Sequence, residues 1–529
     1  MLKRFIVFPL LVALFPVLSL YSLNSDQFRL GVVWLPLATT LAATAAIWAI
    51  AAFVFRSVHR GAMFAALVIL LFFSFGHMLN ALEGSETHVF GMGPTIVSLL
   101  LSGILFVAVT LFILKTPKTA GRLLLVENFA ALCLVAVPLT DIAIKQSHRL
   151  AFLQPLAGLP VFAQAKAADT DPDIYYIILD GYGRDDILRD LYGYDNSEFT
   201  NHLATKGFKI AAKSRSNYGQ TAASLASSLN MTYLDRHTAG VKSDSRDRNF
   251  FAGMIRESWV WSFLKNRGYA FTIFATSYDM LNMKSVGNFV GPESLTEFEG
   301  GVIGMTPLAA AKPQFSAHRE YVRYAFAHLG DAPASNAPTF TFAHIAAPHP
   351  PFVFDADGGD VTMSERYTMG DGSHIVGPGG ITWRQYRDGY VKQLAYVNRC
   401  AMKAVDEILA RARRPLVIVI QGDHGPGSLL DQEDPGHTYL TERFSILNAY
   451  YLPTGGTSDI YDSISPVNTF RVVLNRYFGM SYRLLPDRSY FSTWNQPYRY
   501  IPVTEAIDAE SPSRAAALIS EKGGSDHAN

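Results

Sequence analysis

Apolar runs dominate the first 150 residues and constrain the fold more than any other feature of the chain. A helix needs about 20 residues to cross the apolar core of a bilayer. Five runs are close to this length: residues 5–23, 30–55, 63–82, 96–114 and 123–144. We therefore expect a five-span transmembrane domain over residues 1–150, with the rest of the chain folded outside the bilayer.

The charged residues between these runs predict how the chain crosses the membrane. Basic residues flank alternate connections, and acidic residues occupy the others: Lys3, Arg4, Arg56, Arg60, Lys115, Lys118 and Arg122 against Asp26, Glu83 and Glu86, with Arg29 as the one exception. Because cytoplasmic loops carry the excess of Lys and Arg, everything after Ile144 is expected outside the cytoplasm. The pattern predicts a multi-pass membrane protein, and the Ala-rich composition favours a Gram-negative bacterial setting, in which this membrane is the cytoplasmic (inner) one. A cleaved signal peptide is the alternative for the first run, although no small-residue cleavage site follows it.

Composition sets further limits on partners and domains. Lys plus Arg and Asp plus Glu both number 45, so the formal net charge is zero and nothing favours a nucleic-acid partner. Only Cys133, in the fifth run, and Cys400 occur, so no disulfide can form within the exported part. A chain of 529 residues is longer than one ordinary domain. We expect a linker at residues 151–172, an extracytoplasmic domain at 173–504 and a polar, disordered tail at 505–529.

Two buried strands are predicted to deliver polar residues to one edge of a sheet. The first strand is predicted at residues 416–420, which are apolar and precede Asp423 and His424. The second is predicted at residues 173–179 and is followed directly by Asp180. Ligands of open α/β sheets bind beyond the carboxyl ends of the strands, so these side chains should meet there. A carboxylate oxygen beside an imidazole nitrogen suits zinc or manganese. The alternative is an ordinary strand-to-loop turn at each strand end.

A helix lined with small residues is predicted within residues 214–230, with Thr221 in its first turn and Asn217 as its cap. The unpaired N–H groups and the dipole of a helix start attract phosphate or sulfate. A hydroxyl placed there, if it also binds a metal, loses its proton more readily and becomes a nucleophile. We interpret the serines further along this helix as packing residues.

Three histidines are candidates for contact with a substrate. His349 follows a third strand, residues 339–345, in a proline-rich loop that cannot become helical, and rigid placement suits a group that meets a substrate oxygen. His344 lies inside that strand and is either a substrate ligand or a core histidine. His437 lies in a later loop and is expected to face the site. The Gly- and Asp-rich segment 355–380 is predicted to be a solvated loop near the cleft.

The order of Asp180, Thr221, Asp423 and His424 on an α/β pattern resembles the alkaline phosphatase/sulfatase superfamily. The most specific parts are Gly422-Asp-His-Gly and Thr221-Ala-Ala-Ser-Leu. Five amino-terminal spans before an extracytoplasmic domain look like the lipoteichoic acid synthases and the lipid A phosphoethanolamine transferases. The resemblance implies a multi-span helical membrane domain and an α/β domain with a mainly parallel central sheet flanked by helices. It also implies that the four named residues hold one divalent metal ion, Zn²⁺ or Mn²⁺.

The chain departs from these families in several ways. The transferases usually have glutamate at the position of Asp180, where aspartate is a shorter oxygen ligand, and they often carry several disulfides. The residues around Thr221 lack the Cys or Ser, followed by Pro and Arg, that family sulfatases mature, which argues against sulfate ester hydrolysis. The stretch around His344 lacks the Asp-x-x-x-His that begins the second metal site of two-metal phosphatases.

The resemblance implies a metal-dependent transferase that moves a phospholipid-derived phosphoryl headgroup, of the phosphoethanolamine or phosphoglycerol type, to a cell-envelope acceptor. Thr221 would carry the phosphothreonine intermediate, His349 would donate a proton to a transferring oxygen, and His344 and His437 would bind substrate. The expected partners are a membrane lipid donor and a lipid or glycan acceptor, and the expected state is a monomer. Two alternatives remain open: a membrane-anchored phosphate or sulfate ester hydrolase, and a non-catalytic envelope scaffold.

Overall fold

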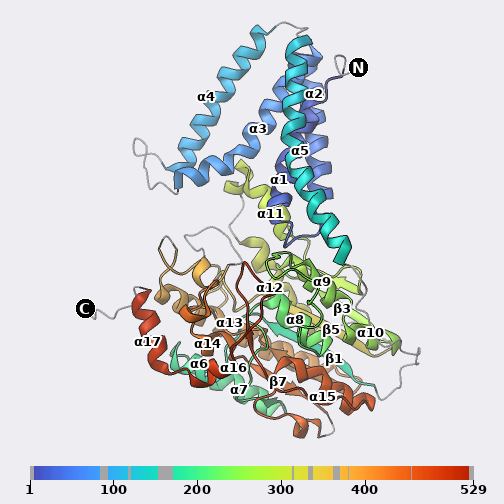
Figure 1. Cartoon of the computed structure of the whole chain (residues 1–529), viewed down its shortest axis with the longest axis vertical. Coiled ribbons are helices and arrows are strands. Elements are labelled where there is room, and N and C mark those ends of the chain that lie inside the picture. The colour runs from blue at the N-terminus through green and yellow to red at the C-terminus, as the bar shows by residue number, and fades with distance from the viewer. Residues whose placement is uncertain are drawn as a thin grey trace. The chain divides into compact units, whose positions relative to one another are not determined.

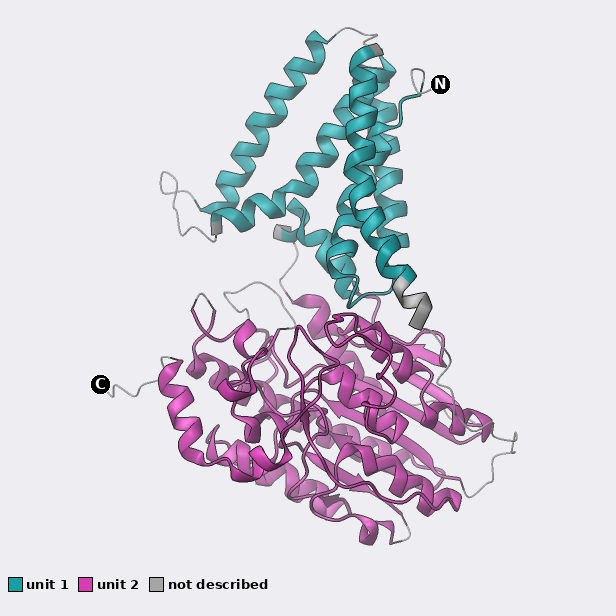
Figure 2. Ribbon diagram, viewed as in Figure 1, with its two compact units in different colours: residues 1–153, 295–314 teal, residues 154–294, 315–529 magenta. Residues whose placement is uncertain are grey.

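The computed structural model of the chain describes residues 5–83, 93–116, 121–152, 171–311, 315–331, 337–361, 370–378, 380–453 and 455–522. It divides into two compact units, coloured separately in Figure 2: residues 1–153 with 295–314, and residues 154–294 with 315–529. We call them the helical unit and the sheet unit and describe each by itself. The linker predicted at residues 151–172 lies almost wholly outside the described residues.

Apolar helices make up most of the helical unit (Figure 1): α1 (Phe8–Asn24), α2 (Trp34–Val54), α3 (Val58–Glu83), α4 (Pro94–Lys115) and α5 (Gly121–Phe152). Four segments are long and apolar enough to cross a membrane: Leu30–Val54, Val58–Leu82, Pro94–Lys115 and Arg122–Ser147. Helix α1 is apolar but shorter, with 17 residues. Four membrane-capable helices are therefore confirmed, and the count of five spans stays a prediction.

Polar side chains fasten α1 to α5. The Asn128 Oδ1 atom accepts hydrogen bonds from the N–H groups of Val7 and Phe8, at 3.1 and 3.0 Å. These bonds satisfy donors that a helix start leaves unpaired. Near the other end of α1, Ser22 Oγ donates to Asp141 Oδ2 at 2.6 Å. These hydrogen bonds fix the position of α1 along α5, which the packing of apolar side chains alone would not fix.

Residues 295–314 belong to the helical unit, which corrects the prediction that residues 173–504 form one domain. This segment contains α11 (Glu297–Gly304) and the 3-10 helix η4 (Pro307–Ala311). Phe298 is 1% exposed, and its ring centroid lies 5.4 Å from that of Phe28 and 6.3 Å from that of Tyr21. The Gly76 N–H donates to the Met305 carbonyl at 2.9 Å. No run of apolar residues long enough to span a bilayer marks this segment in the sequence.

Replacing Phe298 by Ala should destabilise the helical unit by about 3 kcal/mol, because a buried aromatic side chain and its ring contacts are lost. Leu308→Ala is the matched control, since Leu308 lies in the same segment but is 53% exposed. The melting temperature of the purified full-length chain in detergent measures both changes. Equal melting temperatures for the two variants would contradict the packing of residues 295–314 on these helices.

The sheet unit is built on a seven-stranded sheet of strand order β2-β7-β6-β1-β5-β3-β4. Its strands are β1 (Asp173–Leu179), β2 (Lys209–Ile210), β3 (Ala270–Phe274), β4 (Asn288–Val290), β5 (Thr339–Ile345), β6 (Leu416–Gln421) and β7 (Asn448–Tyr451). β1 pairs in parallel with β5 and β6, and β3 pairs in parallel with β4 and β5. Among the described strands of this sheet, the antiparallel pairs are those that β7 forms with β2 and β6. The predicted mainly parallel sheet is confirmed.

Helices cover both faces of this sheet, because its central strands are apolar on both sides. Successive residues of β1 alternate between two core clusters, as the period of a strand requires. One cluster takes side chains from α8 (Thr221–Asn230), α9 (Asn249–Arg256), α10 (Trp259–Asn266) and α15 (Pro466–Phe478). The other takes side chains from α6 (Asp185–Asp190), α7 (Ser197–Thr205), α12 (Ser316–His328) and α13 (Trp383–Arg411).

The register of the three central strands brings their carboxyl ends level. Leu179 of β1 stands opposite Ile345 of β5, and Ile178 stands opposite Gln421 of β6. The residues that directly follow these strands therefore lie at one edge of the sheet, where ligands of open α/β sheets bind.

The tail predicted to be disordered instead forms two helices, α16 (Thr504–Ala509) and α17 (Pro512–Glu521). Ala515 and Leu518 pack in a cluster with Trp383, Leu429 and Tyr439. The Glu510 carboxylate accepts hydrogen bonds from the first N–H groups of α14 (Leu440–Phe444), at 3.1 and 2.6 Å. A few apolar residues at helical spacing are enough to hold these helices in place, because they pack on a surface formed by residues remote in sequence. Residues 523–529 of this tail lie outside the described residues.

Candidate active site

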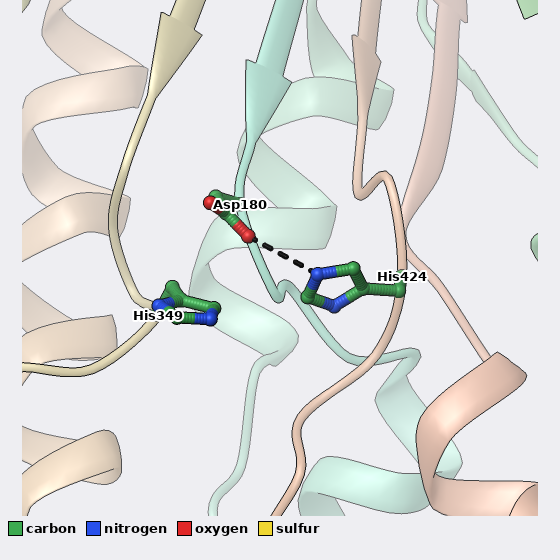
Figure 3. A group of neighbouring side chains, drawn as sticks. All are labelled: Asp180, His349 and His424. Atoms are coloured by element: carbon green, nitrogen blue, oxygen red, sulfur yellow. Dashed lines mark ion pairs between the residues drawn. The ribbon is translucent and has the colours of Figure 1, made fainter. Parts of the chain in front are cut away.

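Three strand ends place ionisable side chains around one point. Asp180 follows β1, Asp423 and His424 follow β6, and His349 lies in the loop after β5. Figure 3 shows Asp180, His349 and His424 turned toward one another from these three segments. All four side chains are buried. The meeting of these residues at the strand ends is what the sequence predicted.

Thr221 is the first residue of α8 and joins the same group. Its Oγ1 atom lies 3.3 Å from His424 Nε2. One turn later, Ser224 Oγ donates to the Asp423 carbonyl at 2.7 Å, which fastens the helix start to the end of β6. The predicted cap is wrong: Gln220 occupies the cap position of α8. Asn217 Oδ1 instead accepts from an N–H of the first turn of α15, at 2.8 Å.

Three donor atoms lie at the ligand spacing of a tetrahedral metal site from His424 Nε2. From His424 Nε2, the distances are 3.3 Å to Thr221 Oγ1, 3.4 Å to Asp180 Oδ1 and 3.5 Å to Asp423 Oδ2. Four ligands at about 2.0–2.2 Å from a tetrahedral zinc ion are separated from each other by roughly 3.3–3.6 Å. Asp180 Oδ1 and Asp423 Oδ2 are buried, and neither has a hydrogen-bond partner among the described residues. Buried, unpaired carboxylate oxygens are costly, and a divalent cation is the partner that this set of donors fits.

The imidazole of His424 is set up as a metal ligand. Its Nδ1 lies 2.9 Å from the Gly425 carbonyl, which can only accept a hydrogen bond, so Nδ1 carries the proton and Nε2 offers its lone pair. Burial, followed by the nearby Arg443 guanidinium, lowers the pKa of His424. The neutral form that metal binding requires is therefore favoured.

Opposite charges tune two further groups. Burial alone would raise the pKa of Asp180, but the surrounding imidazoles of His349, His344 and His424 hold it far below its usual value. Burial disfavours the charged form of His349, but the carboxylates of Asp180 and Asp371 outweigh this effect and raise the pKa of His349. Asp180 thus stays ionised, and His349 is favoured as a proton donor.

Asp371 and Arg443 complete the wall of the site, and the sequence did not single them out. Asp371 lies in the segment predicted to be solvated, yet it is 3% exposed. Its Oδ2 pairs with Arg443 Nη1 at 2.6 Å, and its Oδ1 accepts from the Tyr386 hydroxyl at 2.7 Å. His349 Nε2 lies 3.8 Å from the same Oδ2 atom. The pair therefore links a distant loop to the candidate proton donor.

Arg443 also holds the backbone on both sides of the donor set. Its Nε donates to the Gly219 carbonyl at 2.8 Å, and Nη1 donates to the Gly425 carbonyl at 3.2 Å. A Cβ on Gly425 would collide with the Glu442 carbonyl, and a Cβ on Gly427 would collide with the Asp371 carboxylate. The glycines after His424 were the one sequence signal of this close packing.

The two histidines predicted to bind substrate lie in different places. His344 is buried beside Asp180, with Nε2 3.3 Å from Asp180 Oδ2, on the side of the carboxylate away from His424. His437 is exposed and pairs with Asp434 at 2.7 Å. The structure does not bring His437 into the buried group around Asp180.

A mainly parallel α/β sheet with Asp, Thr and Asp-His donors at its carboxyl edge defines an enzyme of the alkaline phosphatase/sulfatase superfamily. Residues 172–457, more than half of the chain, match the model of the Sulfatase family. The chain therefore belongs to the Sulfatase family, as its motifs predicted. No curated protein matches the chain.

Three solved structures are similar to this chain at low sequence identity. The C-terminal periplasmic domain of EcEptC from Escherichia coli, in complex with Zn, is 12% identical with a TM-score of 0.42, covering 67% of this chain and 98% of that one. Lipooligosaccharide phosphoethanolamine transferase A (EptA) from Neisseria meningitidis is 12% identical with a TM-score of 0.36, covering 89% and 94%. The periplasmic domain of phosphoethanolamine transferase EptC from Campylobacter jejuni is 10% identical with a TM-score of 0.35, covering 60% and 92%.

The Asp423→Asn change should strip the site of its metal while leaving the fold intact, because it removes the charge of an unpaired oxygen but keeps its shape. We expect a larger loss of affinity than the roughly 10-fold that loss of an outer-shell partner causes. Asp195→Asn, at an exposed carboxylate, is the control. Elemental analysis of the purified full-length chain measures bound zinc and manganese, and equal metal content in the two variants would refute the site.

Proposed function

We propose that this chain is a metal-dependent transferase that moves a phospholipid-derived phosphoryl headgroup, of the phosphoethanolamine or phosphoglycerol type, to a cell-envelope acceptor. The observation that carries the proposal is the place of Thr221. Its hydroxyl is one of the four donor atoms and also stands at the first residue of α8. A helix start stabilises the negative charge of a phosphoryl group, so nucleophile and anion-binding group coincide.

The donor set fits a divalent ion, held by Asp180, Asp423, His424 and Thr221. When bound, such an ion supplies Lewis acidity that lowers the pKa of a coordinated hydroxyl. Two carboxylate oxygens, one imidazole nitrogen and one hydroxyl at tetrahedral spacing favour Zn²⁺, with Mn²⁺ as the alternative. Both ions accept this mixture of oxygen and nitrogen ligands.

In the first half-reaction, Thr221 reacts as its alkoxide, after release of its hydroxyl proton to solvent, and Oγ1 attacks the phosphorus of the lipid headgroup. A new P–O bond forms to Thr221, and the P–O bond to diacylglycerol breaks. His349 gives its proton to the leaving diacylglycerol oxygen, a role that the raised pKa of His349 supports. The N–H groups at the start of α8 stabilise the charge on the non-bridging oxygens.

In the second half-reaction, an acceptor hydroxyl attacks the same phosphorus. His349, now neutral, takes the proton of this hydroxyl, and the P–O bond to Thr221 breaks, so both residues return to their first state. The acceptor is a lipid or glycan alcohol of the cell envelope. If water took the place of this alcohol, the same site would act as a hydrolase.

The helical unit supports a lipid as the donor. Four of its helices are membrane-capable, so the chain that carries the phosphoryl-transfer site also resides in the bilayer. We propose that α1 adds a fifth crossing, with the amino terminus in the cytoplasm. The inserted α11 packs on Tyr21 and Phe28, at the α1–α2 end that the charge pattern places outside. An inner-membrane protein with its catalytic part outside the cytoplasm, acting as a monomer, is the arrangement we propose.

The test of the proposed chemistry is intact-mass analysis of the full-length chain after incubation with mixed phospholipids and Zn²⁺ or Mn²⁺. We expect a headgroup-phosphate adduct on the wild type, mapped to Thr221, and its mass identifies the headgroup. Thr221→Ala should show no adduct. Ser227→Ala, in the buried part of the same helix, should keep it. An adduct that water removes as fast as any alcohol would identify a hydrolase, and metal binding without any adduct would refute the transferase.

The proposed orientation predicts which engineered cysteines an impermeant maleimide reaches. In a Cys133→Ala, Cys400→Ala background, we expect Asp195→Cys to be labelled in intact spheroplasts, since Asp195 is exposed on the sheet unit. Arg56→Cys, between α2 and α3, should react only after lysis. Labelling of Arg56→Cys but not of Asp195→Cys in intact spheroplasts would contradict the proposed topology and indicate the reverse one.

A further inference from the structure

We infer that His344 is a positioning residue of the metal site. Held by Thr276, it donates a hydrogen bond to Asp180 Oδ2 and thereby turns the other oxygen of Asp180 toward the metal. The inference rests on the metal site of the proposed function. It assigns to His344 a role that differs from the substrate contact expected from the sequence.

His344 faces Asp180 from the neighbouring strand. It stands on β5 opposite Ile178 of β1, two residues before Asp180. Its Nε2 lies 3.3 Å from Asp180 Oδ2, and the two side chains are 0% and 4% exposed. On the other side of the carboxylate, Oδ1 lies 3.4 Å from His424 Nε2. Each carboxylate oxygen of Asp180 therefore faces a different imidazole.

The partner of Nδ1 indicates which nitrogen of His344 carries the proton. Nδ1 lies 3.2 Å from Thr276 Oγ1, and the Tyr278 N–H donates to that oxygen at 3.4 Å. The hydroxyl hydrogen of Thr276 is thus available for Nδ1, which acts as the acceptor. In the tautomer that this contact favours, Nε2 carries a proton directed at Asp180 Oδ2. The other tautomer would set a nitrogen lone pair against a carboxylate, which is repulsive.

His424 shows the opposite arrangement. The partner of its Nδ1 is the Gly425 carbonyl, which accepts but cannot donate. Its Nε2 therefore has a free lone pair and can bind a metal, whereas the protonated Nε2 of His344 cannot. The two imidazoles on either side of Asp180 are thus a ligand and a hydrogen-bond donor, although Asp180, His344 and Asp423 each offer a ligand atom within 4.8 Å of the others.

Loss of the donor would leave Asp180 less well oriented. The Nε2 atom of His344 is buried and has no hydrogen-bond partner among the described residues, and the Asp180 Oδ2 atom lies 3.3 Å from it. With both oxygens unpaired, the carboxylate can turn or offer either oxygen to the metal. Partners of metal ligands typically change metal affinity or activity by about 10- to 100-fold.

The first comparison is between His344→Leu and His344→Gln. Leucine fills the space without a donor, whereas the amide of glutamine can place an N–H near the position of Nε2. We expect about a 10-fold or greater loss of zinc affinity in His344→Leu, with most of the affinity restored in His344→Gln. The measurement is chelator competition on the purified full-length chain in detergent, with the number of zinc ions per chain determined alongside.

The second comparison changes Thr276, which touches no donor atom of the metal. Thr276→Val should lower zinc affinity several-fold, because Nδ1 loses its hydroxyl partner, and Thr276→Ser should restore it. Thr341→Val is the matched control: Thr341 is a buried threonine of β5 whose hydroxyl has no hydrogen-bond partner. A merely structural role of Thr276 would give Val and Ser variants the same zinc affinity.

The outcomes separate this inference from the proposed function. One zinc ion in every variant, with the expected order of affinities, supports the positioning role. A fall from two zinc ions to one in His344→Leu would make His344 a ligand of a second site and overturn it. Unchanged zinc affinity in His344→Leu and Thr276→Val would also overturn it, while the metal site stands. Absence of zinc from the wild type would refute the site itself.

Discussion

Two buried carboxylate oxygens without hydrogen bonds are the constraint on which the site depends. Asp180 Oδ1 and Asp423 Oδ2 are removed from water by the same fold that brings them together. An unpaired buried charge costs several kcal/mol. The imidazoles around Asp180 offset part of this cost, and a divalent cation held there would offset the rest. The sheet, the start of α8 and the wall formed by Asp371 and Arg443 all hold these oxygens in place, so metal binding and local stability are coupled.

The residues that the sequence predicted correctly share one property: each directly follows a local pattern. Asp180 and Asp423 come after apolar runs that can only be buried strands, and parallel pairing then brings the strand ends level. Thr221 opens a helix whose small residues mark it as packed. Local patterns of this kind determine where a strand or helix ends, and the parallel sheet converts these ends into one site.

The residues that the sequence did not reveal are placed by long-range packing. Asp371 lies in a Gly-rich segment without periodicity, and its contacts with Arg443 and Tyr386 join it to the buried site. Residues 295–314 look like an ordinary part of the sheet unit, but they pack on the apolar helices. The tail after residue 504 has too few apolar residues to predict helices, yet a preformed surface orders it. In each case the partner is remote in sequence, so no local pattern reports it.

The roles of the histidines show the limit of residue type as a guide to chemistry. His344 and His424 both lie at the ends of central strands, both are buried and both face the Asp180 carboxylate. A carbonyl beside Nδ1 makes one of them a lone-pair donor at Nε2, and a hydroxyl that can donate makes the other a hydrogen-bond donor there. The difference comes from Thr276, which is 68 residues away from His344 in sequence. The function of an imidazole in this fold is thus determined by the partner of its far nitrogen, and that partner is set by tertiary structure.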